Sequence, residues 1–179
     1  MSTTSTGDAA GSAPHTVYLD LPANVAYLGV LRACIQELLA GIEVSDHEGV
    51  DYAVRLAASE LMTNIVQHGY AGRGGRIRFA LTLAPGGSQF VIETQDQSGC
   101  AFDPACVPEP SIEALDGRGL YLIRQLVDQV TYSDGHGQAW ESRESGPFEP
   151  AEAGEPLPSG AWWRLVKALP ALDGEEGCA

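Results

Sequence analysis

The segment SELMTNIVQHG (residues 59–69) places three polar side chains, Glu60, Asn64 and His68, at strict four-residue spacing in a mostly apolar sequence. Residues four apart on a helix are rotated by roughly 40° from one another, so the three side chains form one slanted polar ridge. Leu61 and Ile65 flank this ridge closely. The ridge is therefore expected to border a cavity, although a solvated helix face explains the segment equally well when it is taken alone.

The polar ridge ends a long predicted helix. Ser45 and Glu48 match a capping box, in which the hydroxyl and the carboxylate satisfy N–H groups at a helix start. The helix is predicted from there to Gly69. Its expected core stripe consists of apolar residues at helical spacing, namely Val50, Val54, Ala57, Ala58, Leu61 and Ile65.

Other segments show strand and helix periodicity. Apolar residues alternate in 16–22, which indicates a first strand, and follow helical spacing in 24–41. RIRFALTLA (76–84) and SQFVIETQD (88–96) alternate on either side of a PGG turn and predict a hairpin. Three further elements are predicted, namely a helix over 119–130, a strand near 130–134 and a last strand over 161–169.

Because the strands pair through turns and the helices come in blocks, the chain is predicted to be a two-layer α/β sandwich. Its sheet should be mixed but mainly antiparallel, with helices on one face and an open or partner-covered second face. A single domain is expected over 15–170, between a disordered tail, 1–14, and a C-terminal tail, 171–179. The acidic, Pro- and Gly-rich segment 141–160 is predicted to be a mobile loop that extends a hairpin.

Composition narrows the function classes. Ten basic and 24 acidic residues give a net charge of −14, which argues against direct nucleic-acid binding and favours a protein or small-molecule partner. The four cysteines are far apart and form no C-x-x-C pair, so free thiols are expected rather than disulfides or a metal site. No apolar run of 18 residues and no signal-like N-terminus is found, which predicts a cytoplasmic protein with no membrane span.

A second motif, DQSGCAFDP (96–104), begins where a strand should end. The Asp96 carboxylate at a strand end can accept a hydrogen bond from the exocyclic amine of a purine. Gly99, three residues later, lets a planar ring approach the backbone. In isolation, a D-x-x-G turn with no ligand is the better interpretation of this motif.

A third motif, DGRGLYLI (116–123), opens a predicted helix whose first turn carries no acidic side chain. Gly117 and Gly119 expose backbone N–H groups, and the positive end of the helix dipole favours a phosphate there. Arg118 could add a charged donor. Residues 96–118 between the last two motifs read as an irregular loop, and loops of that length are usually functional or disordered.

In combination, ELMTNIVQH, DQSGCAFDP and GRGLYLI resemble the N, G1 and G2 boxes of the GHKL superfamily, named for gyrase, the heat-shock chaperone of ninety kilodaltons, histidine kinases and MutL. Within it, the form E-L-x-x-N-x-x-x-H-G and the short chain resemble anti-sigma factor serine/threonine kinases of the RsbW and SpoIIAB type. The resemblance covers roughly residues 15–170. It implies the Bergerat, or histidine kinase-like ATPase, fold with ATP and Mg²⁺ as cofactors.

The resemblance also implies roles for individual residues. Asn64 would hold Mg²⁺ against the phosphates, and Glu60 would orient or deprotonate the attacking hydroxyl. Asp96 would bind the adenine amine with Gly99 beneath the ring, and residues 103–116 would form an ATP lid. The residues expected to line the phosphates are Gly117, Arg118, Gly119 and Leu120. His68 could join the nucleotide site, or pack locally and bond a backbone carbonyl.

Two positions depart from the family pattern. Asp116 stands where many relatives have a glycine, and its carboxylate would weaken ATP binding unless it turns away. Ala161 stands where relatives commonly have a threonine that supports the adenine-binding aspartate. Position 161 therefore does not supply this support for Asp96.

The leading interpretation is a kinase that transfers the γ-phosphate of ATP to a serine or threonine of a STAS-fold anti-sigma antagonist. By the same resemblance it would also bind a sigma factor and form a homodimer. The second interpretation is a switch protein that sequesters partners, with or without ATP. The third is the catalytic half of a split histidine kinase, which is weaker because Gln67 stands where sensor kinases usually carry lysine.

Overall fold

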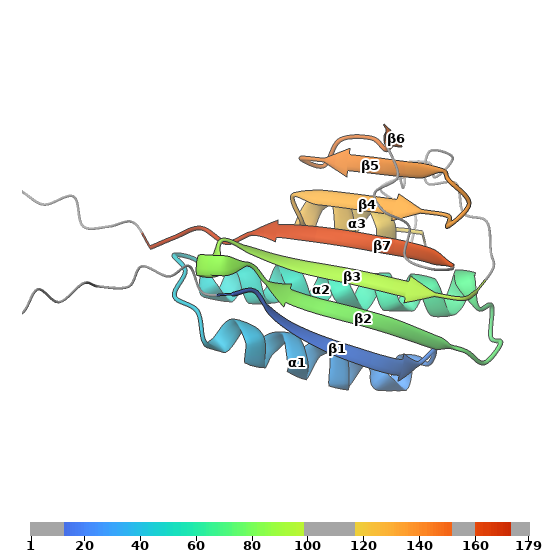
Figure 1. Ribbon diagram of the computed structural model, residues 1–179, viewed down its shortest axis with the longest axis horizontal. Helices are drawn as coiled ribbons and strands as arrows, with labels where there is room; N and C mark the ends of the chain where they lie inside the picture. Colours follow the sequence, from blue (N-terminus) through green and yellow to red (C-terminus); the bar gives the residue numbers. More distant parts are fainter. Residues whose placement is uncertain (1–12, 99–116, 152–159, 173–179) are drawn as a thin grey trace, which may run out of the picture.

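The computed structural model of the protein describes residues 13–98, 117–151 and 160–172. In these residues one sheet forms a layer, and the α-helices lie together behind it (Figure 1). The helical elements are η1 (Val25–Tyr27), α1 (Leu28–Ala40), α2 (His47–Asn64), η2 (Ile65–Gly69), η3 (Pro85–Gly87) and α3 (Gly119–Leu126). The strands are β1 (His15–Pro22), β2 (Arg76–Leu83), β3 (Gln89–Asp96), β4 (Gln129–Ser133), β5 (Ala139–Arg143), β6 (Glu149–Ala151) and β7 (Ala161–Ala168).

The seven described strands are ordered β1-β2-β3-β7-β4-β5-β6, and each neighbouring pair is antiparallel. This confirms the predicted two-layer α/β sandwich with helices on one face. The last strand, β7, does not lie at an edge but is inserted between β3 and β4. Its first residue, Ala161, therefore pairs with Asp96 at the end of β3.

The core lies between the sheet and the helices, as the two periodicities predict. On β2, Ile77, Phe79 and Leu81 are at most 1% exposed and face the helices, while the residues between them face outward. The predicted stripe of α2 is buried at every position, namely Val50, Val54, Ala57, Ala58, Leu61 and Ile65. Burying each large apolar side chain contributes roughly 1.5–3 kcal/mol, so this layer stabilises the positions of α2 and β3.

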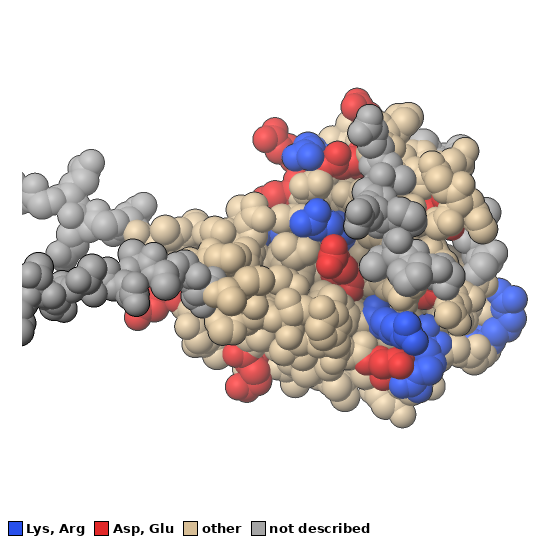
Figure 2. Space-filling model, viewed as in Figure 1, with Lys and Arg blue, Asp and Glu red and all other residues tan. Residues whose placement is uncertain are grey.

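The second sheet face is not covered by a helix in the described part of the chain (Figure 1). Figure 2 shows acidic and basic side chains scattered over this face between uncharged ones. Ion pairs join Arg76 to Asp20 at 2.7 Å and Lys167 to Asp128 at 3.3 Å. Such exposed pairs contribute little to the stability of the fold. The hydrogen bonds between strands, rather than these ion pairs, therefore keep this face ordered.

The start of α2 differs from the predicted capping box. The N-cap is Asp46, whose carboxylate accepts a hydrogen bond from the Gly49 N–H at 3.0 Å. Ser45 instead donates its backbone N–H to the Pro170 carbonyl at 3.2 Å. The predicted role of Ser45 is therefore wrong, because a contact with the distant C-terminal segment fixes its backbone outside the helix.

The ends of two predicted helices are also different. Residues 65–69 form a π-turn, in which the Tyr70 N–H donates to the Ile65 carbonyl at 2.9 Å. The helix predicted over 119–130 stops at Leu126, because Val127 is extended. Val130 is buried in the sheet, where it pairs with Leu165 of β7. At this point, pairing with β7 determines the backbone conformation, although the sequence pattern is helical.

The segment predicted as a loop over 141–160 is partly sheet. Arg143 ends β5, and Glu149 begins β6. The connection between them packs against α3: Arg124 Nη2 donates to the Ser145 carbonyl at 2.9 Å, and Ser145 Oγ donates to the Arg124 carbonyl at 3.0 Å. The loop prediction is therefore wrong for residues 141–143 and 149–151, which are strands, whereas residues 144–148 form the connection between them.

Several predictions concern residues outside the described ranges. These are the lid at 103–116, Gly99, Asp116, three of the four cysteines and most of the two predicted tails. The fourth cysteine, Cys34, is a free thiol. Within the described ranges, no helix is both long enough and apolar enough to cross a membrane.

Candidate functional site

Glu60 and Asn64 of the polar ridge meet the first residue of α3. A Cβ atom placed on Gly119 would lie 2.9 Å from Asn64 Oδ1, 2.9 Å from Glu60 Oε2 and 3.1 Å from Asn64 Nδ2. Real Cβ atoms essentially never approach a heavy atom closer than 3.0 Å. The absence of a side chain at Gly119 therefore allows α3 to begin directly against the ridge, so the structure brings these three predicted residues together.

The start of α3 is electropositive toward this contact. Its first turn carries no acidic residue, and its N-cap, Arg118, makes no side-chain cap. Gly117 has a positive φ of 80°, a conformation that strongly favours glycine, and Leu120 is buried in the core. The uncapped N–H groups and the helix dipole make this end suitable for an anion, with the Asn64 amide and the Glu60 carboxylate beside it.

Asp96 is a buried carboxylate at the end of β3. It is 3% exposed, and its Oδ1 accepts a hydrogen bond from the Ser98 N–H at 2.9 Å. No hydrogen bond to the second oxygen, Oδ2, is found in the described part of the chain. On the same side of the sheet its strand neighbours are Ile77 and Ala161, neither of which has a polar side-chain group. A buried carboxylate with a spare acceptor is suited to bind an amine.

Tyr70 connects the polar ridge to the Asp96 strand. It follows the π-turn and is 5% exposed. Its hydroxyl donates to the Arg76 carbonyl at 2.5 Å and accepts from the Gln97 N–H at 3.2 Å. The ring lies over Gly75, where a Cβ atom would be only 1.9 Å from Tyr70 Cε1. The end of η2 and the end of β3 are therefore held together by one buried phenol.

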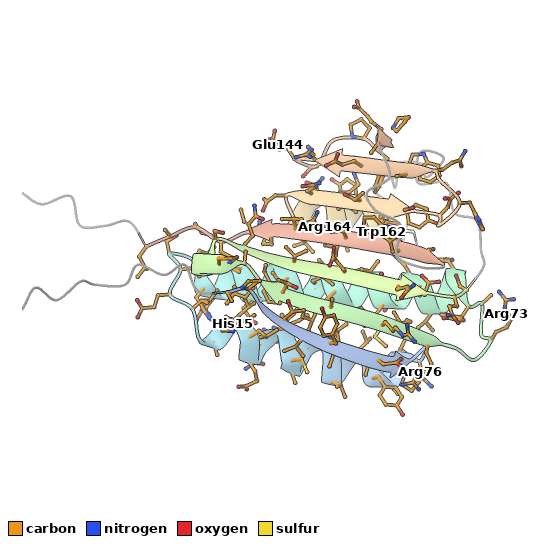
Figure 3. The ribbon with its side chains drawn as sticks, in the orientation of Figure 1. His15, Arg73, Arg76, Glu144, Trp162 and Arg164 are labelled. Atoms are coloured by element: carbon orange, nitrogen blue, oxygen red, sulfur yellow. The ribbon has the colours of Figure 1, made fainter. Side chains whose placement is uncertain are left out.

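Arg73 joins the same two segments from the surface. Its guanidinium donates to the Gly69 carbonyl and to the Ser98 carbonyl, both at 3.4 Å. Figure 3 shows Arg73 and Trp162 at the same end of the sheet, where β3 finishes and β7 starts. The sequence analysis did not single out Tyr70 or Arg73. An aromatic residue between a helix end and a glycine-rich turn could have indicated a side chain that packs on that turn and holds it in place.

Gly160 sets the distance between the start of β7 and Asp96. Its φ is +97°, and a Cβ atom on it would lie 2.1 Å from the Asp96 carbonyl oxygen. A Cβ atom on Gly135, in the β4–β5 turn, would lie 2.3 Å from the Gly160 carbonyl oxygen. The backbone of Gly160 thus packs against that of Asp96, and the backbone of Gly135 packs against that of Gly160. Neither glycine has room for a side chain.

His68 does not join either group of residues. It lies on the π-turn with an exposed side chain, and no hydrogen bond links it to another residue of 13–98, 117–151 or 160–172. The predicted bond to a backbone carbonyl is therefore not observed. Residues 65–69 follow π rather than α geometry, so four-residue spacing no longer predicts that His68 shares the line of Glu60 and Asn64.

The structure thus places the predicted residues in two groups. Glu60 and Asn64 at the C-terminal part of α2 meet Gly119 of α3 in the first group. Asp96 at the end of β3, with its backbone support, forms the second. A family model described as the histidine kinase-like ATPase domain matches residues 21–140, more than half of the chain and all of these positions. The chain belongs to this family.

Similar curated proteins carry the name serine-protein kinase RsbW. The protein from Bacillus pumilus (strain SAFR-032) is 26% identical over 126 residues, covering 64% of this chain and 75% of the relative. The protein from Bacillus licheniformis is 28% identical over 121 residues, covering 61% and 72%. The protein from Bacillus subtilis (strain 168) is 26% identical over 124 residues, covering 64% and 75%. The resemblance to GHKL anti-sigma factor kinases is confirmed at this level.

The family implies the use of ATP, and the residues of this histidine kinase-like ATPase fit that group. The cradle at Gly119 would be filled by any side chain, and the oxygens beside it, Asn64 Oδ1 and Glu60 Oε2, are of the type that Mg²⁺ prefers. Within the described residues, no three His, Cys, Asp or Glu side chains gather as a metal site. An ion bound with a nucleotide completes its octahedron with phosphates and waters, so one protein oxygen can suffice.

Proposed function

We propose that this chain is a Mg²⁺- and ATP-dependent serine/threonine protein kinase of the cytoplasm. Its substrate is an anti-sigma antagonist of the STAS fold, and its second partner is a sigma factor that it captures once the antagonist is phosphorylated. It works as a homodimer. The observation that carries the proposal is the approach of Gly119 to Glu60 and Asn64, because it places a carboxylate and an amide beside an uncapped helix N-terminus.

The residues divide the work of phosphoryl transfer. Asp96 Oδ2 accepts a hydrogen bond from the amine of the base and so fixes the nucleotide along the sheet. The first N–H groups of α3 would hold the phosphates, and Asn64 would hold the ion, which would supply positive charge against them. Glu60 accepts the proton of the attacking hydroxyl as the new P–O bond forms and the bond to ADP breaks. Positioning and charge carry this reaction, so few side chains are needed.

A Glu60→Gln variant tests the proposal. Glutamine keeps the length and the hydrogen-bonding capacity of the side chain but cannot accept the proton. Phosphate transfer from Mg²⁺-ATP to a STAS antagonist should fall by at least about 10²-fold, the range of a lost general base. Binding of Mg²⁺-ATP and capture of the sigma factor should persist. Glu37→Gln, an exposed carboxylate on α1, is the matched control and should leave transfer unchanged.

The outcomes separate the alternatives. Unchanged transfer by Glu60→Gln would remove Glu60 from its assigned role. No binding of Mg²⁺-ATP by the wild-type protein at millimolar concentration would favour a switch that only sequesters partners. A phosphorylated product that is lost in acid would indicate phosphohistidine, and hence a split histidine kinase, because phosphoserine survives that treatment.

A further inference from the structure

A tight turn after β5 lies against the C-terminal end of α3. The Gly146 N–H donates to the Arg143 carbonyl at 2.8 Å. The two residues between them, Glu144 and Ser145, have positive φ values of 49° and 63°. Residues other than glycine adopt this conformation at a cost, and they keep it where the surroundings hold them in place. The contacts of this turn must therefore compensate for its backbone conformation.

Ser145 and Arg124 of α3 bond each other in both directions. The Ser145 hydroxyl donates to the Arg124 carbonyl at 3.0 Å, and Arg124 Nη2 donates to the Ser145 carbonyl at 2.9 Å. The Arg124 guanidinium also lies 5.7 Å from the centre of the Phe148 ring, within the range of a cation–π contact. A further hydrogen bond, of 3.1 Å, joins the Glu144 N–H to the Asp128 carbonyl just after α3. The turn is thus fastened to the end of this helix.

The Ser145 hydroxyl caps the C-terminal end of α3. The last four carbonyls of an α-helix have no N–H partner within the helix, and Arg124 is the third residue from the end of α3. A side chain from a distant segment therefore satisfies one of these carbonyls. The turn itself is attached to the sheet, because β5 pairs with β4. Ser145 consequently links the position of α3 to that of the sheet.

The opposite end of α3 is the candidate phosphate site. Figure 3 shows Glu144, of the turn, and Arg73, near the site, toward opposite ends of the sheet. Leu120 and Ile123 bury α3 in the core, but apolar burial is non-directional and fixes a helix along its axis less well than a hydrogen bond does. An eight-residue helix moves as one rod about 12 Å long. A displacement at its C-terminal end would therefore move the start of α3 relative to the polar ridge.

We propose that Ser145 is a positioning residue for the phosphates of the bound nucleotide. By holding the Arg124 carbonyl, its hydroxyl fixes α3 along its axis and so sets where the first N–H groups of α3 meet the phosphates. This inference rests on the proposed nucleotide site, and it assigns to that site a residue at the far end of α3. Binding of the base at Asp96 on β3 does not depend on this contact.

Two substitutions of Ser145 and two ligands test the inference. Alanine and glycine both remove the hydroxyl. In each variant the Kd for Mg²⁺-ATP should rise about 2- to 10-fold, the factor by which one hydrogen bond changes the population of the binding-competent position. The Kd for adenosine, which has the base but no phosphates, should stay unchanged. Calorimetric titration measures the first Kd, and NMR titration measures the second, weaker one.

The two variants separate positioning from stability. Ser145→Ala keeps the strained φ and should lower the melting temperature by about 2–4 °C, the shift that the loss of one hydrogen bond causes in a chain of this length. Ser145→Gly relieves the strain, so its melting temperature should stay close to that of the wild type. Thr82→Ala is the matched control, because Thr82 Oγ1 hydrogen-bonds to Thr16 Oγ1 at 3.0 Å between β1 and β2. It should lower the melting temperature and leave both Kd values unchanged.

The results distinguish this inference from the proposed function. If both Ser145 variants bind Mg²⁺-ATP as tightly as the wild type, or lose affinity for adenosine by the same factor, the inference is overturned and the nucleotide site stands. If only Ser145→Ala loses affinity for Mg²⁺-ATP, the effect follows stability rather than the hydroxyl, and the inference is overturned as well. A wild-type protein that binds Mg²⁺-ATP no more tightly than adenosine, or binds neither, overturns the proposed site together with the inference.

Discussion

Replacing Gly119 by alanine tests whether the contact between α3 and the polar ridge matters. The added methyl carbon would lie 2.9 Å from both Asn64 Oδ1 and Glu60 Oε2, whereas ordinary van der Waals contact begins at 3.4 Å. Either the start of α3 or the two side chains must therefore move by about 0.5 Å. The backbone itself accepts alanine, because Gly119 is the first residue of a helix and has no positive φ.

The global stability should change little, because two effects oppose each other. Alanine is favoured over glycine in helices by up to about 1 kcal/mol, and the displaced contact offsets this gain. The melting temperature should stay within about 4 °C of the wild type. Affinity should fall much further, because losing the Asn64 contact to a charged ligand costs about 1.5–3 kcal/mol, or about 10- to 150-fold in the Kd for Mg²⁺-ATP.

The assay is calorimetric titration of Mg²⁺-ATP with thermal scans of the same samples. Gly29→Ala is the matched control: Gly29 is the second residue of α1, and a Cβ atom there has nothing within 4 Å. That variant should be as stable as the wild type or more so, with the same Kd. If Gly119→Ala binds Mg²⁺-ATP as the wild type does, the approach of α3 to Glu60 and Asn64 has no part in nucleotide binding and the reasoning is refuted.

Three further substitutions probe the support of the site. Tyr70→Phe removes a hydroxyl with two backbone partners, so urea unfolding should show a decrease of about 1–3 kcal/mol in the unfolding free energy. An unchanged urea midpoint would mean that the Tyr70 hydroxyl does not hold η2 and β3 together. Gly160→Ala places a methyl carbon 2.1 Å from the Asp96 carbonyl at a φ of +97°, and should cost at least about 3 kcal/mol or abolish soluble expression. Asp46→Ala removes the N-cap of α2 and should lower the unfolding free energy by about 1 kcal/mol, with no change in the Kd for Mg²⁺-ATP.

Local periodicity predicted most of the fold. The alternation of β2 and the apolar stripe of α2 each depend on neighbours within a few residues, and the structure confirms both. The predictions failed where a distant segment decides the local structure. Ser45 is held by Pro170, and Val130 is drawn from a helix-like pattern into the sheet by its partner on β7. Neither contact can be predicted from the residues next to Ser45 or Val130.

The candidate site shows the same division. Spacing predicted that Glu60 and Asn64 share a face, and the structure adds that Gly119 lies against them. The same spacing placed His68 on that face, but the π-turn at 65–69 changes the rotation per residue just before it. The role of Tyr70 depends on the Arg76 carbonyl and the Gln97 N–H, which come together only when η2 and β3 are in place.

Two features of the candidate site are unfavourable when no ligand is bound. Asp96 is a buried carboxylate with a spare oxygen, and α3 begins beside the Glu60 carboxylate without a side-chain cap. Each costs free energy in the nucleotide-free protein, and a ligand that brings an amine and phosphates would compensate for both. Nucleotide binding should therefore stabilise this protein more than the surface area that the nucleotide covers suggests. A protein that never binds a nucleotide would gain nothing from this arrangement, whereas an ATP-dependent kinase and an ATP-gated switch would both use it.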